Sequence, residues 1–175
     1  MKTACLSALL AGAALISAAA AYAQTEIIGV DWELSRLNGK TRAPFARVTE
    51  LKAAPEVNFQ DHLRAIVTLR NPAAKAVEGV VLRYAVSLRL IRKGDAADKA
   101  FWSVPFYVEE VRVTKINPAS EKQTRVIRFE LQNQLRKLRN SGFTPLALRM
   151  EVMVGPRQGD EPASIMREAV IEIKP

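Results

Sequence analysis

The stretch that decides the fold is GVVLRYAVSLRLIR, residues 79–92. Apolar side chains recur at every second position, a period that places them on one face of a β-strand. The side chains predicted to face the core are Val80, Leu82, Tyr84, Val86, Leu88 and Leu90. Those predicted to face outward are Val81, Arg83, Ala85, Ser87, Arg89 and Ile91. A helix is the alternative, but the β-branched and aromatic content favours a long strand, which ends at the turn residues Lys93-Gly94-Asp95.

Other segments alternate in the same way, although less completely. In residues 62–70 the predicted apolar face is Leu63, Ala65, Val67 and Leu69, and the polar face is His62, Arg64, Thr68 and Arg70. In residues 145–154 the inward set is Leu146, Leu148, Met150, Val152 and Val154, and the outward set is Ala147, Arg149, Glu151 and Met153. Further strands are predicted at residues 26–33, 45–52, 101–113, 122–130 and 164–173. Pro105 interrupts one of them and confines that part to a sheet edge or a bulge.

The period changes only once. Leu131, Leu135 and Leu138 are spaced i, i+4 and i+7, which predicts a short helix over residues 131–139. All other periodic segments are strands at short spacing with turn residues between them. The pattern therefore predicts an all-β fold, an antiparallel β-sandwich of about seven or eight strands. An α+β fold with a larger helical share is the alternative.

One part of the chain resembles a known class of domain. The sequence Val67-Thr68-Leu69-Arg70-Asn71-Pro72, followed by the alternation from Val80 to Leu90, is a strand ending in Asn, a polar turn and a long strand. This order resembles that of bacterial exported immunoglobulin-like and fibronectin-type-III-like domains, over most of residues 24–175. The Cys pair of antibody domains is missing. The resemblance implies an immunoglobulin-like sandwich that serves as a binding or spacer module, and such sandwiches host many functions.

The first residues have the pattern of an export signal. A basic start at Lys2 is followed by an uncharged apolar run from Ala4 to Ala20 and by the small-x-small site Ala21-Tyr22-Ala23. This pattern predicts a secretory signal peptide, residues 1–23, cleaved after Ala23. A membrane anchor is the weaker alternative, because no basic stop-transfer flank follows. We expect residues 24–175 to be a single periplasmic or secreted domain without a transmembrane segment.

Removal of the signal also changes what chemistry is available. Cys5, the single cysteine, leaves with it, so the mature domain has neither disulfides nor thiol chemistry. The formal net charge falls from +8 to +7 as Lys2 is lost. A basic domain of this kind attracts anionic partners.

Few residues point to catalysis, metal binding or a cofactor. His62 is the only histidine, and no Gly-x-Ser-x-Gly elbow accompanies it. Metal ligands are not clustered in the sequence, and the thioethers of Met150 and Met153 are an odd number of residues apart, so they face opposite ways on a strand. No glycine-rich phosphate loop joins a strand to a helix. We expect no enzyme activity and no cofactor, although an unrecognised carboxylate pair of a hydrolase stays possible among the 18 acids.

Two groups of residues are candidates for binding. Arg83, Arg89 and Arg149 fall on outward positions of strands that are neighbours in the usual sandwich order, where they predict one basic patch. Outward arginines that only keep the sheet soluble are the alternative. The second group consists of Trp102 and Tyr107, which flank Pro105 together with Phe101 and Phe106. We expect Phe106 in the core, and core packing is the first interpretation of the whole group. The functional alternative is that Trp102 or Tyr107 is exposed on an edge, as a stacking platform for a sugar or as an edge that pairs with a partner's strand.

These observations favour a non-enzymatic interaction or assembly module of the bacterial cell envelope. It would bind an envelope protein, an anionic glycan or a lipid headgroup through the basic face or the aromatic edge. A carbohydrate-binding module is the first alternative, and a hydrolase with an acid pair is the second. Nucleic acid is not an expected partner, because an exported domain of this size has no recognised binding motif.

Overall fold

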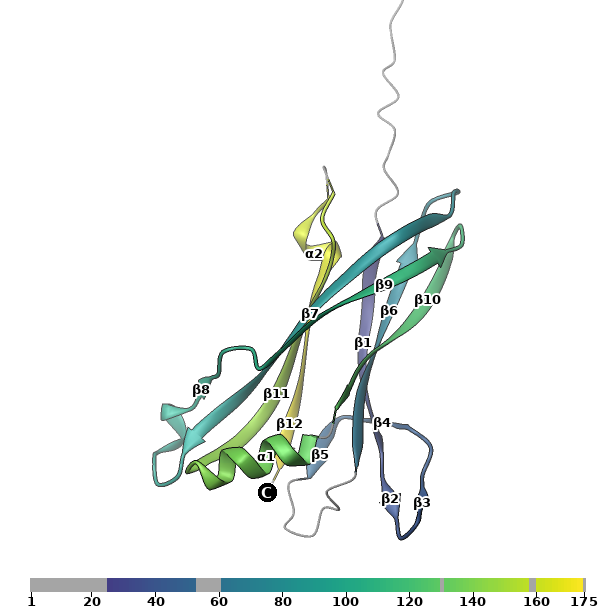
Figure 1. Ribbon diagram of the computed structural model, residues 1–175. Coiled ribbons are helices and arrows are strands. Elements are labelled where there is room, and N and C mark those ends of the chain that lie inside the picture. The colour runs from purple at the N-terminus through teal and green to yellow at the C-terminus, as the bar shows by residue number, and fades with distance from the viewer. Residues whose placement is uncertain (1–24, 53–60, 130, 158–159, 175) are drawn as a thin grey trace, which may run out of the picture.

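A computed structural model describes residues 25–52, 61–129, 131–157 and 160–174. The predicted signal, residues 1–23, and the cleavage after Ala23 lie outside the described residues. Strands predominate, and they form two main sheets that face each other across an apolar core (Figure 1). The fold is an all-β sandwich, which confirms the prediction from the alternating pattern.

The smaller sheet is antiparallel throughout. Its strand order is β10 (Ser120–Phe129), β6 (His62–Asn71), β1 (Glu26–Ser35) and β4 (Ala46–Val48). The predicted apolar face of β6 is confirmed, because its four side chains are all buried: Leu63, Ala65, Val67 and Leu69. A separate small hairpin joins β1 to β4, made of β2 (Leu37–Asn38) and β3 (Thr41–Arg42).

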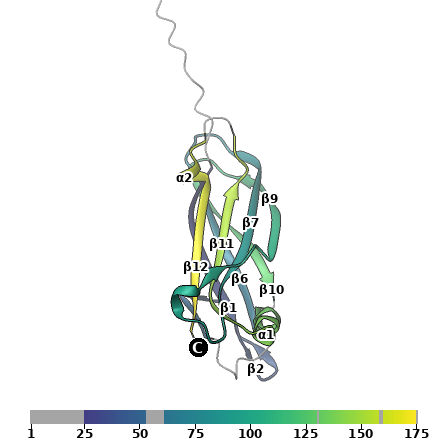
Figure 2. The same ribbon diagram turned by 90° about the vertical axis from the view of Figure 1, so that its left-hand side faces the viewer.

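The larger sheet is built around one long strand. Its strand order is β5 (Glu50–Lys52), β12 (Met166–Lys174), β11 (Phe143–Val154) and β7 (Val77–Arg92). Two strands share the other edge of β7: β8 (Phe101–Trp102) and β9 (Tyr107–Ile116). The elongated shape of the molecule follows from the length of β7, which Figure 2 shows beside β9 and β11.

The alternation in β7 is confirmed on its inward side. All six side chains predicted to face the core are buried, with exposed fractions of 5% or less. On the outward side the exception is Ser87, which is only 1% exposed. Its direction is as predicted, but the Arg149 side chain lies across it and its Nε donates a hydrogen bond to Ser87 Oγ at 3.2 Å. An outward direction therefore did not guarantee exposure.

In β11 the register shifts near the start of the strand. The pairing with β7 has an irregularity between Pro145 and Ala147, where the backbone takes up one extra residue. The extra residue is Leu146, which was predicted to face the core and is only half-buried. Ala147 is opposite the outward Arg89 and so points outward as predicted, although it is fully buried. From Leu148 onward the predicted alternation holds, and Met150 is a core residue as expected.

Two predicted strands are divided in the structure. Residues 101–113 form β8 and β9 with Pro105 between them, and the connecting backbone still bonds to β7, since the N–H groups of Ser103 and Phe106 donate to the carbonyls of Leu88 and Val86. Phe106 packs against the core as predicted. Residues 45–52 form β4 in one sheet and β5 in the other, so the chain changes sheets at Thr49.

Helices are few and short. The predicted helix is confirmed as α1 (Leu131–Asn140), where Leu135 is buried and Leu138 packs against the core. A turn of 3-10 helix, η1 (Ala97–Lys99), lies between β7 and β8. The start of the last predicted strand is instead the short helix α2 (Pro162–Ile165), which precedes β12.

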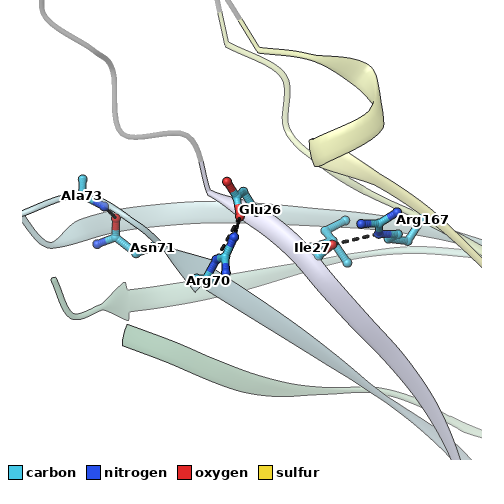
Figure 3. Close-up of polar contacts among 6 residues, drawn as sticks. All are labelled: Glu26, Ile27, Arg70, Asn71, Ala73 and Arg167. Atoms are coloured by element: carbon cyan, nitrogen blue, oxygen red, sulfur yellow. Dashed lines mark hydrogen bonds and ion pairs between the residues drawn. The ribbon is translucent and has the colours of Figure 1, made fainter. Parts of the chain in front are cut away.

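Long-range contacts join the first and last parts of the chain at one side of the sandwich. Arg167 on β12 donates from Nε to the carbonyl of Ile27 on β1 at 2.9 Å (Figure 3). Nearby, Arg70 and Glu26 form an ion pair at 2.5 Å between β6 and β1. At the opposite end of β12, residues Glu172–Lys174 pair in parallel with β5. The last strand is thus fixed against two segments from the first third of the sequence.

The side chain of Asn71 ties two turns together. It is completely buried, and its Nδ2 donates to the carbonyls of Lys75 at 2.8 Å and Asn117 at 3.0 Å. Its Oδ1 accepts from the N–H of Ala73 at 3.1 Å (Figure 3). The turn from β6 to β7 is therefore attached to the turn from β9 to β10. The sequence marks Asn71-Pro72 as the end of a strand, but the second turn is 46 residues away and could not be foreseen.

Substitution of Leu82 by Ala will lower the free energy of unfolding by about 2–5 kcal/mol. The Leu82 side chain on β7 is fully buried, so its removal leaves a cavity in the core. Val108→Ala is the matched control, since that side chain is 71% exposed, and it will change stability by about 0.5 kcal/mol or less. Urea unfolding followed by circular dichroism measures both. Equal effects of the two substitutions would contradict the assigned core.

Asn71→Ala will destabilise the fold by about 1–3 kcal/mol, because part-buried carbonyls of two turns lose their donor. Asn71→Asp is the informative second variant: it keeps the acceptor for Ala73 but removes the amide donor, so it will not restore stability. Thermal unfolding of the three proteins decides this. A neutral effect of Asn71→Ala would show that water satisfies the same carbonyls.

Candidate functional site

Three of the predicted binding residues meet on the outer face of the larger sheet. Arg89 on β7 is paired in register with Trp102 on β8. Arg149 on β11 is paired with Ser87, two residues before Arg89. Because residues two apart on a strand point to the same side, the arginines and the indole lie together across β8, β7 and β11. We call this set, Arg89, Trp102 and Arg149, the Arg–Trp cluster.

Arg149 is the most constrained member of the cluster. Its guanidinium carbon lies 4.4 Å from the centre of the Trp102 ring, a cation–π distance. Its Nε is held by Ser87. Its terminal nitrogens lie 3.6 Å from Glu151 on the same strand and 3.7 Å from Glu168 on β12. The side chain is 22% exposed, so contacts on several sides fix a group that is flexible in solution.

Arg89 has a different environment. It is exposed, and it forms no ion pair with any residue that the structure describes. The ring of Trp102 beside it is half-buried. The cluster therefore presents one fixed guanidinium on an aromatic ring and one guanidinium that is open to solvent.

Of the three arginines predicted to form one basic patch, Arg83 stands apart and two have acidic partners. Arg83 is ion-paired with Glu110 on β9 at 3.1 Å, and Arg149 is flanked by two glutamates. Arg83 also stands six residues from Arg89 on the same strand, about 20 Å along the sheet, so it does not belong to the cluster. Glu110 and Glu168 come from other strands, which is why the outward arginines alone overestimated the charge.

The arginines of the smaller sheet are paired as well. Arg64 on β6 bonds Glu33 on β1 at 2.6 Å, and its guanidinium carbon lies 3.8 Å from the centre of the Phe45 ring. Arg47 on β4 is paired with Asp31. These cross-strand pairs agree with the alternative role of outward arginines, which is to keep a sheet soluble.

Tyr107 lies on the opposite face of the sheet from Trp102, so the two do not form a common stacking platform. It is paired in register with Val86, an inward residue, and its ring stacks on that of Tyr84 with centroids 6.0 Å apart. Both tyrosine hydroxyls donate to Glu109, the Tyr107 bond being 2.9 Å long. Because Pro105 interrupts the alternation, the sequence did not show which face of the sheet Tyr107 occupies. Glu110 faces the other way, toward Arg83, as expected for adjacent strand residues.

The pKa values of Tyr84 and Tyr107 are both raised. Burial, followed by the hydrogen bond to Glu109, raises the pKa of Tyr84 above its ordinary value. The same acceptor is the largest cause of a raised pKa at Tyr107, with burial second. Tyr84 also accepts a bond of 3.3 Å from the backbone N–H of Ile127, which sits in a bulge of β10 with a φ of +59°. A β-branched residue in this conformation is strained, so the Tyr84 hydroxyl helps to hold it.

The remaining chemical candidates are placed as follows. His62 is half-buried at the start of β6, and Met150 and Met153 fall on opposite faces of β11. Among the described residues, no three His, Cys, Asp or Glu side chains are grouped so that they could hold a metal ion. Over the same ranges, helices are too short or too polar to cross a membrane.

A shallow hollow of about 420 Å³ lies at the other end of the larger sheet. Arg83 and Glu110 line it together with the segment after β11, where Asp160 accepts a bond from the Arg157 N–H at 2.7 Å. Its charged side chains are of both signs and Arg83 is already paired with Glu110. This hollow therefore offers less to a charged ligand than the Arg–Trp cluster does.

Comparison with known proteins gives similarity at the level of structure alone. No protein-family model matches the chain, and no curated protein matches it. The crystal structure of the sporulation control protein Spo0M from Bacillus subtilis aligns with 88% of this chain and 51% of that chain, at 14% identity and a TM-score of 0.40. The C-terminal domain of Wzt aligns with 88% of this chain and 77% of that chain, at 8% identity and a TM-score of 0.35. This chain thus spans about half the length of Spo0M. The resemblance to immunoglobulin-like domains stays a prediction.

Tyr84 and Tyr107 will ionise at a higher pH than free tyrosine, with Tyr84 the later of the two. Because both pKa values are raised in the fold, this contribution to stability is present below about pH 10 and is lost as the pH rises above it. Tyrosinate absorbance and circular dichroism along an alkaline titration test this, with Tyr107→Phe to separate the signals. Ionisation of both near pH 10 without loss of structure would contradict it.

Proposed function

We propose that this protein is an exported, non-enzymatic binding module of the bacterial envelope, and that it binds an anionic ligand at the Arg–Trp cluster. The export part rests on the signal pattern of residues 1–23. The binding part rests on one observation: the guanidinium of Arg149 is fixed over the ring of Trp102 beside the exposed Arg89.

The roles of the two arginines differ. Arg149 shares its charge with Glu151 and Glu168, so its main contribution is to orient the indole and to present an ordered set of N–H donors. Arg89 is free of such partners among the described residues and supplies the attraction for an anion. A guanidinium binds carboxylate or phosphate through two parallel hydrogen bonds. Ordering before binding reduces the entropy that is lost on association.

The ligand class that fits this arrangement is an acidic sugar. The exposed part of the Trp102 ring offers a flat apolar surface for a sugar ring, and Arg89 stands beside it for a carboxylate or phosphate substituent. The basic face and the aromatic edge, treated as separate surfaces in the sequence, thus combine into one site. The partner classes that follow are an anionic glycan or an acidic patch on an envelope protein.

Two alternatives are outcomes of the same test. A carbohydrate-binding module would use Trp102 for neutral sugars and would not need Arg89. A hydrolase would need two carboxylates around a bond to be cleaved. Glu151 and Glu168 are opposite each other in register, but both point their carboxylates to the same arginine on an open sheet face. That arrangement suits ion pairing better than it suits proton transfer to a sugar.

Titration of the protein with an oligogalacturonate will quench or shift the emission of Trp102, whereas its fully methyl-esterified form will not. Arg89→Gln and Trp102→Leu will each weaken binding about tenfold, as expected for a lost charge-assisted hydrogen bond or a lost ring contact. Calorimetry measures the affinity of the Trp102 variant. Arg83→Gln is the matched control and will bind normally.

Each other result of this titration has a definite meaning. Equal affinity for the acidic and the neutral sugar would replace the proposal with the neutral carbohydrate-binding module. Binding that survives Arg89→Gln would remove the cluster as the site. No binding of acidic sugars, of inorganic phosphate or of an acidic peptide would reject the proposed function. Trp32 is 4% exposed in the core, so it does not report on surface binding.

A further inference from the structure

One end of the molecule carries exposed cations and the exposed ring of Phe101. There the chain leaves β7, passes through η1 and enters β8, while α1 ends and β11 begins (Figure 1). The two segments are joined, because the N–H of Lys93 donates to the carbonyl of Gly142 at 2.9 Å and Arg92 is paired in register with Phe143. We call the exposed residues of this end the basic tip: Arg92, Lys93, Lys99, Lys137 and Phe101.

The charge of the basic tip differs from that of the sheet faces. Its four cations are exposed, and none forms an ion pair with a carboxylate of the described residues. Two further cations, Arg136 and Arg139, lie on α1 beside Lys137, whereas the acids of the connecting segment are two, Asp95 and Asp98. Elsewhere on the larger sheet Arg83 and Arg149 have glutamate partners. The four exposed cations of the tip differ in this respect from Arg83 and Arg149.

The tip also exposes an aromatic ring. Phe101 is 46% exposed, which is unusual for a large apolar side chain. Its ring is held in place, since it meets the edge of the Phe143 ring with centroids 6.1 Å apart. One fixed aromatic side chain thus lies beside a group of cations at this end.

We propose that the basic tip docks onto the surface of an anionic phospholipid bilayer. Cations that surround exposed apolar side chains complement such a surface, because the cations attract the phosphates and the apolar groups enter the boundary between headgroups and acyl chains. A folded acidic partner would favour a flat or hollowed surface, whereas the tip is a projecting end. The inference uses residues outside the Arg–Trp cluster and goes beyond the proposed function. If both proposals hold, the Arg–Trp cluster lies close to the membrane, on the outer face of the larger sheet.

Co-sedimentation with vesicles tests the proposal directly, using protein purified after expression of the full 175-residue chain. The protein will bind phosphatidylcholine vesicles in which about one lipid in three is the anionic phosphatidylglycerol, and it will not bind pure phosphatidylcholine. Higher salt will weaken binding, because it screens the headgroups. Each cation removed costs roughly fivefold in affinity, so the double variant K93Q/K137Q will bind about 25-fold more weakly.

Two further variants separate docking from general charge and from misfolding. K75Q/R112Q removes two exposed cations at other places and will bind within about twofold of the unchanged protein. Phe101→Ser keeps all charges and will weaken binding roughly tenfold if the ring enters the boundary. Circular dichroism and thermal unfolding confirm that each variant is folded.

The outcomes divide cleanly. Equal losses for K93Q/K137Q and K75Q/R112Q would show that only net charge matters and would overturn the docking proposal. Binding that Phe101→Ser leaves unchanged would overturn its apolar part, and the absence of binding to anionic vesicles would overturn all of it. K93Q/K137Q will still bind the oligogalacturonate normally, and Arg89→Gln will still bind vesicles within about fivefold of the unchanged protein. Failure of one proposal is thereby distinguishable from failure of the other.

Discussion

The two-residue alternation of β7 governs the whole molecule. Over 16 residues this strand is hydrogen-bonded to β11 on one side and to β9 and β8 on the other. Its inward side chains form the centre of the core, and a shift by one residue would turn that entire apolar set toward water. The burial of the inward set therefore fixes the outward set at the same time. Arg89 stands beside Trp102 because Leu88 and Leu90 are in the core, so the candidate site is a consequence of packing on the other face.

The features predictable from the sequence are those set by local periodicity. The inward face of β7, the face of β6 and the helix α1 depend on spacing within one segment, and apolar burial enforces that spacing. The rest depends on partners that are far apart in the chain. Glu110 and Glu168 neutralise outward arginines from other strands, and the Arg149 side chain buries Ser87. Bulges could not be predicted either, because the one extra residue before Ala147 does not change the alternation of apolar residues in the sequence.

The candidate site was foreseen in part for the same reason. Strand order predicted that Arg89 and Arg149 are neighbours, and the structure adds Trp102 to them. Tyr107 could not be assigned to a face, since Pro105 interrupts the alternation that would have decided it. Its inward position reveals a second polar group, with Glu109 and Tyr84, that supports the strained turn of the backbone at Ile127. A glutamate at an exposed edge thus has a structural role that composition alone does not indicate.

The attachment of the last strand has a consequence for how the molecule assembles. β12 pairs in parallel with β5, and Arg167 reaches Ile27 across 140 positions of sequence. Contacts between such distant segments form slowly, because closing the long loop costs entropy before the contacts contribute any favourable energy. The larger sheet also lacks its connection to β5 until β12 is available. A nascent chain therefore cannot complete this fold before β12 has been synthesised.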